Sequence, residues 1–293
     1  MQTQGRTEGY HHIEVRPITG VLGAEIHGID LRAPSEAAVA EVRRALGENL
    51  VITFPGQVIG HAEHIHFSRQ LGEHIRMPQV KSLEGFEDLQ LIKREADSTG
   101  KVIGEAWHAD STWMECPPAA VAMRAIDVPD FGGDTGFTSM YAAYDALSAG
   151  MKALLGSLHA VHSGTKTYGS QYKAGDGKRF DKNFNAMDEK LVDRERTHPV
   201  VCVHPVSGRK YLFVNRSFVQ RFEGMTEEES KPLLEYLYAH ASRFEFTCRI
   251  RWQKDLLLIW DNRASMHTAI SDYAGKARYM LRTTLVGQQP IAS

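Results

Sequence analysis

Cysteine is scarce in this chain, with only Cys116, Cys202 and Cys248 among 293 residues. The three are far apart in the sequence, their number is odd, and no CxxC pair exists. This pattern argues against a structural zinc knuckle and against a disulfide framework. It fits a protein of a reducing compartment, so we expect a cytoplasmic location.

An excess of one charge is also missing, because 34 Lys and Arg stand against 36 Asp and Glu, a formal net charge of -2. Proteins that bind nucleic acids or anionic membranes usually present a basic face, so neither partner is indicated. The N-terminal stretch MQTQGRTEGYHHIEV lacks the apolar region of a secretory signal. No run of about 18 uninterrupted apolar residues occurs, so we expect no membrane span.

Internal repeats, low-complexity segments and a long Pro/Gly/Ser linker are absent from the sequence as well. We therefore interpret residues 1–293 as a single domain. One stretch, residues 166–196, is polar and charged, and it contains Gly175 and Gly177. Long polar segments of this kind in compact proteins are often functional, so we predict a mobile loop or lid there.

Hydrophobic periodicity predicts a β-rich α+β fold. Apolar residues at helical spacing predict helices over residues 35–50, 61–71, 142–158 and 226–241. Alternating or continuous apolar runs predict short strands within 13–31 and strands at 51–54, 89–92, 121–126, 134–139, 247–252, 256–260 and 278–287. Because the regular βαβ alternation of a doubly wound sheet is missing, we expect a double-stranded β-helix, or jelly roll, with flanking helices.

Metal-ligating side chains occur in two separate motifs. His108 and Asp110 lie two residues apart in W-H-A-D-S-T-W, so on a strand they face the same side. His267, which follows an apolar strand in W-D-N-R-A-S-M-H, is the candidate third ligand. Two His and one carboxylate on one face of an octahedron leave positions open for O₂ and a chelating co-substrate, as non-haem Fe(II) oxygenases require. A bare HxD pair is common by chance, and His108 alone could equally be a core or surface histidine.

The final predicted strand carries two arginines on one face. Arg278, Met280, Arg282 and Thr284 occupy alternate positions, and their side chains should point the same way. Two guanidinium groups in an interior are costly without partners, and they bind carboxylates bidentately. We interpret the pair as a clamp for two anions near the metal; the alternatives are pairing with buried acidic residues or a solvent-facing strand. Thr135 could add a hydroxyl to the clamp, or it could simply begin a strand.

These motifs, together with P-P-A-A-V, G-G-D-T-G-F-T-S, R-x-x-x-R and the N-terminal G-x-L-G-A-E-I-x-G-I-D-L, resemble the taurine dioxygenase / 2,4-dichlorophenoxyacetate dioxygenase family in order and spacing. The resemblance spans nearly the whole chain. It implies the double-stranded β-helix and an activity that uses Fe(II), 2-oxoglutarate and O₂. In that family the co-substrate is converted to succinate and CO₂ while a carbon of the prime substrate is hydroxylated. The resemblance also implies a homo-oligomer.

Residue roles follow from the same resemblance. It implies that His108, Asp110 and His267 hold the iron. Thr135 and Arg278 match positions that bind the distal carboxylate of 2-oxoglutarate, with Trp252 and Trp260 as walls of the pocket. Arg282 matches the position that binds the anionic group of the prime substrate.

The substrate is predicted less directly. Taurine dioxygenase uses a His and an Asn where Met77 and Gly104 stand here, so taurine is not expected. Several local sequences look closer to the (R)-phenoxypropionate dioxygenases, which implies an aryloxyalkanoate, a small organic anion, cleaved to a phenol and a 2-oxo acid. Lys81 and the 166–196 segment could contact substrate or could be solvated surface.

Three rival interpretations remain open from the sequence. The first is an alkylsulfatase or sulfonate dioxygenase of the same family, used for sulfur scavenging. The second is a zinc hydrolase with the same three ligands, although R-x-x-x-R after the distal His argues against it. The third is a jelly-roll binding module without any metal.

Overall fold

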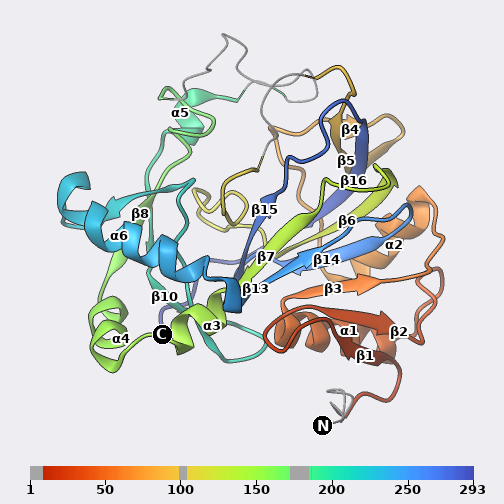
Figure 1. Cartoon of the computed structure of the whole chain (residues 1–293), viewed down its shortest axis with the longest axis horizontal. Coiled ribbons are helices and arrows are strands. Elements are labelled where there is room, and N and C mark those ends of the chain that lie inside the picture. The colour runs from red at the N-terminus through yellow and green to blue at the C-terminus, as the bar shows by residue number, and fades with distance from the viewer. Residues whose placement is uncertain (1–8, 99–103, 172–184, 186) are drawn as a thin grey trace.

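The protein is described by a computed structural model over residues 9–98, 104–171, 185 and 187–293 (Figure 1). In these residues the largest sheet has eight strands in the order β1-β2-β3-β14-β6-β16-β5-β4. The strands are β1 (Glu14–Pro17), β2 (Ala24–His27), β3 (Val51–Phe54), β4 (Ser82–Leu83), β5 (Phe86–Arg94), β6 (Ala120–Asp127), β14 (Leu257–Asp261) and β16 (Arg278–Leu285). All neighbours pair antiparallel except β2 and β3.

Smaller sheets, β13-β7-β15, β12-β8-β9 and β10-β11, complete the strand-rich core. Their strands are β7 (Thr135–Ser139), β8 (His159–His162), β9 (Arg196–Pro199), β10 (Val201–Val203), β11 (Lys210–Leu212), β12 (Val219–Phe222), β13 (Thr247–Ile250) and β15 (Ser265–Ala269). The large sheet and the sheet around β7 face each other across an apolar layer, to which Phe137 of β7 and Trp260 of β14 both contribute. The core is thus the double-stranded β-helix that the sequence predicts.

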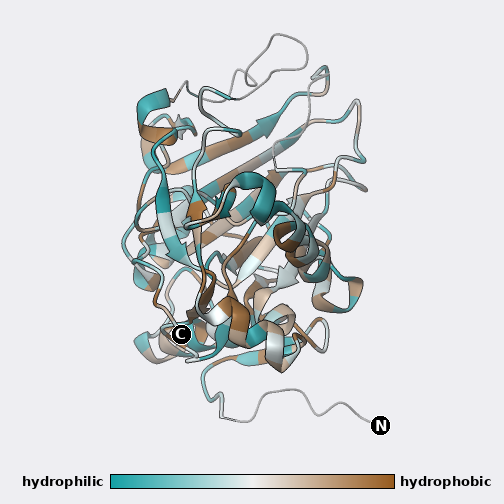
Figure 2. Ribbon diagram, turned by 90° about the vertical axis from the view of Figure 1, so that its left-hand side faces the viewer, coloured by the Kyte–Doolittle hydropathy of each residue, from teal (hydrophilic) through white to brown (hydrophobic). Residues whose placement is uncertain are grey.

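Burial on both faces explains why β14 has the sequence of an unbroken apolar run. Leu258 and Trp260 belong to the apolar cluster between the sheets, whereas Leu257 and Ile259 belong to a second cluster beneath the helices. A strand covered on both sides has no solvent face and therefore shows no polar alternation. In Figure 2 hydrophobic residues colour parts of the strands inside the molecule.

Two helices cover the outer face of the large sheet (Figure 1). These are α1 (Glu36–Asn49), which contacts β3 and β14, and α2 (His61–Leu71), which contacts β5 and β16. Helix α1 begins after Ser35, whose hydroxyl accepts a hydrogen bond from the backbone N–H of Ala38 at 3.2 Å. On the other side of the molecule, α6 (Glu227–Ala241) begins with a capping box formed by Thr226 and Glu229. All three helices confirm the sequence-based expectation.

The predicted helix over residues 142–158 is wrong as a single element. The chain forms α3 (Met140–Asp145) and α4 (Ala149–Gly156), separated by a turn, and β8 then begins. The reason is local: the Ser148 hydroxyl accepts from the backbone N–H of Met151 at 3.2 Å and starts a new helix. Apolar residues continue at helical spacing across Ser148, so the sequence pattern gives no sign that the helix is interrupted there.

The predicted lid over residues 166–196 lies partly outside the described residues, which omit 172–184 and 186. Its described part includes α5 (Glu189–Val192) and the first residue of β9.

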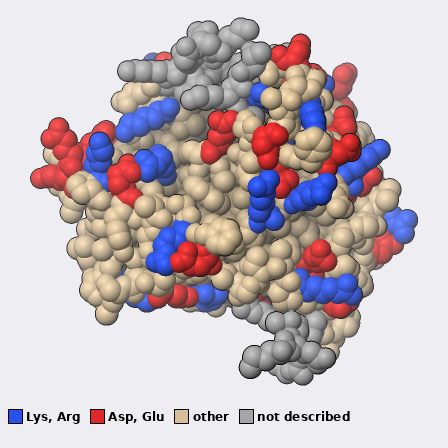
Figure 3. Space-filling view, viewed as in Figure 1, with Lys and Arg blue, Asp and Glu red and all other residues tan. Residues whose placement is uncertain are grey.

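A short 3₁₀ helix, η1 (Phe244–Phe246), follows α6. In the stretches that the structure describes, no helix has the length and apolarity to span a membrane. Basic and acidic side chains are interspersed over the face seen in Figure 3.

Candidate active site

Two histidines and one aspartate lie close together beside β15. His108 forms an isolated antiparallel bridge with His267 on β15, and their ring centroids lie 4.2 Å apart. Oδ1 of Asp110 is 3.6 Å from Nε2 of His108. One ligand atom from each of the three residues lies within 4.8 Å of the others, and no other such group of His, Cys, Asp and Glu occurs among the described residues.

The hydrogen bonds fix which histidine atoms face the centre of this triad. Nδ1 of His108 lies 2.7 Å from the carbonyl oxygen of Ala106, which can only accept, so Nδ1 donates there and Nε2 is the ring nitrogen left to face the triad. Burial, and then the neighbouring His108, lower the pKa of His267 to about 3, so the His267 imidazole is neutral. Two imidazoles and a carboxylate form a donor set that fits a divalent metal ion.

Asp110 supplies the negative charge of the triad. Burial alone would raise the pKa of its carboxyl group, but the charge of Arg282 outweighs burial and holds the pKa well below its usual range. Nη1 of Arg282 donates to Oδ2 of Asp110 at 3.1 Å. One alternative from the sequence, an arginine paired with a buried acid, therefore holds for Arg282, although that acid belongs to the metal triad.

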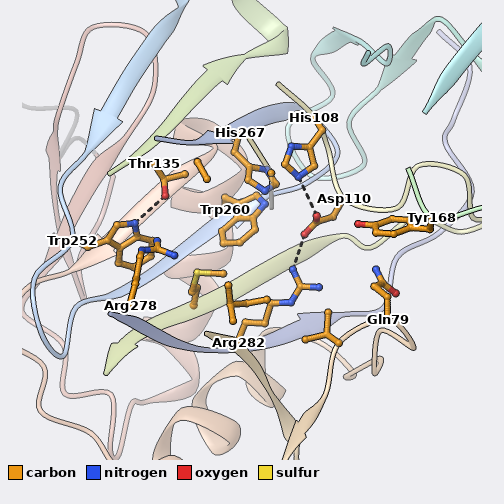
Figure 4. A pocket seen from close by; sticks show the side chains of 15 residues that line it. Gln79, His108, Asp110, Thr135, Tyr168, Trp252, Trp260, His267, Arg278 and Arg282 are labelled. Atoms are coloured by element: carbon orange, nitrogen blue, oxygen red, sulfur yellow. Dashed lines mark hydrogen bonds and ion pairs between the residues drawn. The ribbon is translucent and has the colours of Figure 1, made fainter. Parts of the chain in front are cut away.

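A second polar group lies at one end of the cavity (Figure 4). Nε1 of Trp252 donates to the hydroxyl of Thr135 at 2.9 Å, and the guanidinium of Arg278 lies 5.6 Å from the Trp252 ring. Nε of Arg278 is buried without a hydrogen-bond partner, and burial lowers the pKa of this side chain. We call Thr135, Trp252 and Arg278 the co-substrate end, because a buried cation beside a hydroxyl suits a carboxylate.

The opposite end of the cavity is formed by residues that the sequence did not single out, although Tyr168 belongs to the segment 166–196 that could contact substrate. Gln79 and Tyr168 lie beyond Asp110 and Arg282, on the other side of the triad from the co-substrate end (Figure 4). Burial raises the pKa of Tyr168 to about 12, so its hydroxyl is neutral at ordinary pH. We define Gln79 and Tyr168 as the substrate end; the apolar side chains of Val80, Ile92 and Met123 also line the cavity.

Of the four substrate contacts predicted from the sequence, Arg282 and Gly104 line the cavity, whereas Met77 and Lys81 are not among its lining residues. Met77 is buried, and both its backbone N–H and its carbonyl are hydrogen-bonded to the amide of Gln90. The residues of this segment that line the cavity are Gln79 and Val80. Trp260 also lines the cavity, with its ring centroid 4.8 Å from that of His267.

Comparison with known proteins identifies the family to which the chain belongs. The chain belongs to the taurine catabolism dioxygenase TauD, TfdA family, which matches residues 14–284. It is therefore an α-ketoglutarate-dependent dioxygenase, an oxidoreductase that uses Fe(II), 2-oxoglutarate and O₂. This excludes the zinc hydrolase and the metal-free binding module.

Individual relatives cover almost the whole chain. An α-ketoglutarate-dependent sulfate ester dioxygenase of Pseudomonas putida is 34% identical over 95% of this chain and 91% of its own length. The 2,4-dichlorophenoxyacetate dioxygenase of Cupriavidus pinatubonensis is 31% identical, with 87% and 91% covered. The crystal structure of a taurine dioxygenase from Burkholderia xenovorans superposes with a TM-score of 0.78 at 33% identity, covering 96% of this chain and 93% of that one.

Proposed function

We propose that this dioxygenase hydroxylates the carbon next to a heteroatom in a small organic anion, with aryloxyalkanoates as the first candidate class. In this proposal His108, Asp110 and His267 hold the iron. Thr135, Trp252 and Arg278 bind the distal carboxylate of 2-oxoglutarate, as the resemblance to the family implies. The anionic group of the substrate binds to Arg282.

One observation carries the proposal: β16 places two buried guanidinium groups in the same cavity, on either side of Met280. Arg278 lies at the co-substrate end, and Arg282 lies beside the triad, nearer the substrate end (Figure 4). Nε of each has no hydrogen-bond partner. Among the ion pairs of the described residues Arg278 has no carboxylate partner, and Arg282 shares the Asp110 carboxylate with the proposed metal while its Nε stays without a partner. Since buried guanidinium groups favour anionic partners, the pair favours two anions in one reaction.

The walls of the cavity favour a substrate with an apolar body. Val80, Ile92 and Met123 offer only aliphatic or thioether surface, and the ring of Tyr168 at the substrate end adds an aromatic face. An aryl ring would bury apolar area against these side chains while its carboxylate remains on Arg282. The relative that acts on 2,4-dichlorophenoxyacetate supports this class.

The chemistry divides between the metal and the chain. Bound Fe(II), with 2-oxoglutarate and O₂, supplies the oxidant that inserts oxygen into a C–H bond. Arg282 fixes the substrate anion so that the adjacent carbon faces the triad, and the apolar walls exclude water. A carbon that carries both the new hydroxyl and an ether oxygen is a hemiacetal. It collapses when the hydroxyl proton is lost and the C–O bond breaks, giving a phenol and a 2-oxo acid without a protein base.

A sulfate ester is the second candidate substrate. The specific support is the sulfate ester dioxygenase of Pseudomonas putida, which is 34% identical to this chain. Arg282 would serve a sulfate as well as a carboxylate, and hydroxylation next to the ester oxygen would release sulfate and an aldehyde. The two classes differ in the distance between anion and reacting carbon, so turnover will separate them.

The first experiment tests the iron and co-substrate sites. Fe(II) and 2-oxoglutarate added to apoprotein without oxygen should produce a weak visible charge-transfer band near ~530 nm, as expected for this chelate at an open facial site. His267→Ala should abolish the band. Iron-loaded wild-type protein without the band would refute the proposed sites.

The second experiment identifies the substrate. Both enantiomers of aryloxypropionates, a series of alkyl sulfates and a series of sulfonates are assayed for succinate formation together with release of phenol, sulfate or sulfite. Phenol release in a 1:1 ratio with succinate is expected. Sulfate release coupled to succinate, with aryloxyalkanoates inert, would replace the first candidate by the second.

A further inference from the structure

Asp110 is held through its backbone by a residue from the far end of the chain. Oδ1 of Asn262 accepts the backbone N–H of Asp110 at 2.7 Å, and Nδ2 of Asn262 donates to the backbone carbonyl of Asp110 at 2.9 Å. Nδ2 also donates to the carbonyl of Pro118 at 3.1 Å. The amide thus satisfies both backbone polar groups of Asp110, as a neighbouring β-strand would.

Asp110 needs such a partner because the strand pairing stops just before it. His108 forms a single isolated bridge, and the following residues turn away from the sheet. Ser111 has φ +50°, in the left-handed region that non-glycine residues rarely adopt, and it is buried. A buried, unfavourable turn persists only where its surroundings fix it.

Asn262 is itself rigidly placed. It is fully buried at the end of β14, and its backbone N–H donates to the carbonyl of Ala119 at 2.9 Å. The preceding residue, Asp261, is fully buried and accepts from Nε2 of His204 at 2.9 Å and from the guanidinium of Arg263. The amide that holds Asp110 therefore belongs to the first residue of the turn after β14, which is tied directly to the central sheet.

A second contact holds the same turn two residues later. Nδ2 of Asn215 donates to the hydroxyl of Thr112 at 2.9 Å, and Nδ1 of His162 lies 2.9 Å from that hydroxyl. These contacts secure Thr112 at the end of the turn. Among the hydrogen bonds of the described residues, the Asn262 side chain alone bonds the backbone of Asp110.

We propose that Asn262 is a positioning residue for the metal site: it fixes the backbone of Asp110 so that the carboxylate stands beside Nε2 of His108. This inference rests on the proposed function, in which Asp110 is an iron ligand. Removing an outer contact that orients a metal ligand typically lowers the metal affinity by about 10–100-fold. A side chain that served stability alone would not have this effect.

The test compares Asn262→Ala with Asn49→Ala. Asn49 is also buried, and its Nδ2 donates to the carbonyl of Ala45 at 2.9 Å, far along the chain from the triad. Co(II) is titrated into each metal-free protein by calorimetry, and the visible spectrum is recorded at saturation. We expect Co(II) affinity to fall roughly 10–100-fold in Asn262→Ala only, with an altered saturated spectrum. Both variants should lose thermal stability.

Asn262→Asp keeps the size of the side chain and an acceptor for the Asp110 N–H, but it removes both donated hydrogen bonds. It serves if the alanine variant does not fold, and it should also weaken Co(II) binding. Wild-type affinity and spectrum in a folded Asn262 variant would overturn the inference, as would an equal affinity loss in Asn49→Ala. If wild-type protein fails to bind Co(II), or if His267→Ala binds it normally, the proposed metal site fails instead.

Discussion

Arg282 donates a hydrogen bond from Nη1 to Oδ2 of Asp110 at 3.1 Å, so the cation proposed for the substrate already touches a proposed iron ligand. Both side chains are largely buried. The guanidinium therefore competes with the metal for the charge of Asp110, and a substrate anion competes with Asp110 for the guanidinium. Metal and substrate binding should be energetically linked through this pair.

Arg282→Ala should weaken substrate binding without weakening metal binding. Hydrogen bonds to charged groups contribute about 1.5–3 kcal/mol, so KM for the prime substrate should rise roughly 10- to 150-fold. Co(II) affinity should be unchanged or higher, because a cation beside the carboxylate has been removed. Steady-state kinetics and Co(II) titration measure the two effects. A variant with normal substrate KM would show that the anion binds elsewhere.

Thr135→Val should selectively raise the KM for 2-oxoglutarate. The variant removes a hydroxyl that accepts from Trp252 and is proposed to contact the distal carboxylate. A neutral hydrogen bond contributes about 0.5–1.5 kcal/mol, so a rise of roughly 2- to 13-fold is expected, with substrate KM unchanged. Thr284→Val is the matched control, since its buried Oγ1 has no hydrogen-bond partner. Equal effects of the two variants would argue against a role for Thr135.

Gly104→Ala should disturb the metal site through His108. Gly104 has φ +86°, and an added Cβ would lie 3.1 Å from Cε1 of that imidazole. Gly208 has φ +69° with no atom near an added Cβ, so Gly208→Ala has the same backbone strain without the contact. Each variant should lose about 1–2 kcal/mol of stability. Only Gly104→Ala should lower Co(II) affinity, and normal binding there would contradict the described geometry.

The free energy of unfolding should fall on acidification because of His64. Burial, followed by the charge of Arg124, lowers the pKa of His64 to about 3, against 6.5 for an ordinary histidine. Above pH 6.5 the His64 side chain is neutral in both the folded and the unfolded state. Between pH 6.5 and about 3 it is protonated in the unfolded state but stays neutral in the folded state. The loss from this residue is roughly 2 kcal/mol between pH 7 and 5.

His64→Gln should flatten this pH dependence, because the replacement has no proton to gain. Its amide can still donate to the carbonyl of Ala122, which lies 3.2 Å from Nε2 in the wild-type protein. Urea unfolding at a series of pH values between 7 and 5 gives the slope for both proteins. Parallel curves would show that His64 is not the group responsible.

The sequence predicted those parts of the site that regular strands position. His108 and His267 lie at paired strand positions, and Arg278 and Arg282 lie on one face of β16, so spacing and motif were sufficient. Gln79 was missed in favour of Met77 because residues 72–81 are largely irregular, and no period sets the direction of their side chains. Tyr168 was not singled out because it lies in the polar segment 166–196, for which the sequence predicts a loop or lid but no side-chain direction.

The order of β16 within the sheet affects how the enzyme is made. β16 is the last strand in chain order among the described residues, yet it lies between β5 and β6. During synthesis these two strands emerge early and must wait as unpaired edges, which are prone to pair with other chains. Both cavity arginines arrive with the strand that closes the gap. The proposed sites for the co-substrate and for the substrate anion are thus complete only after β16 has inserted between β5 and β6.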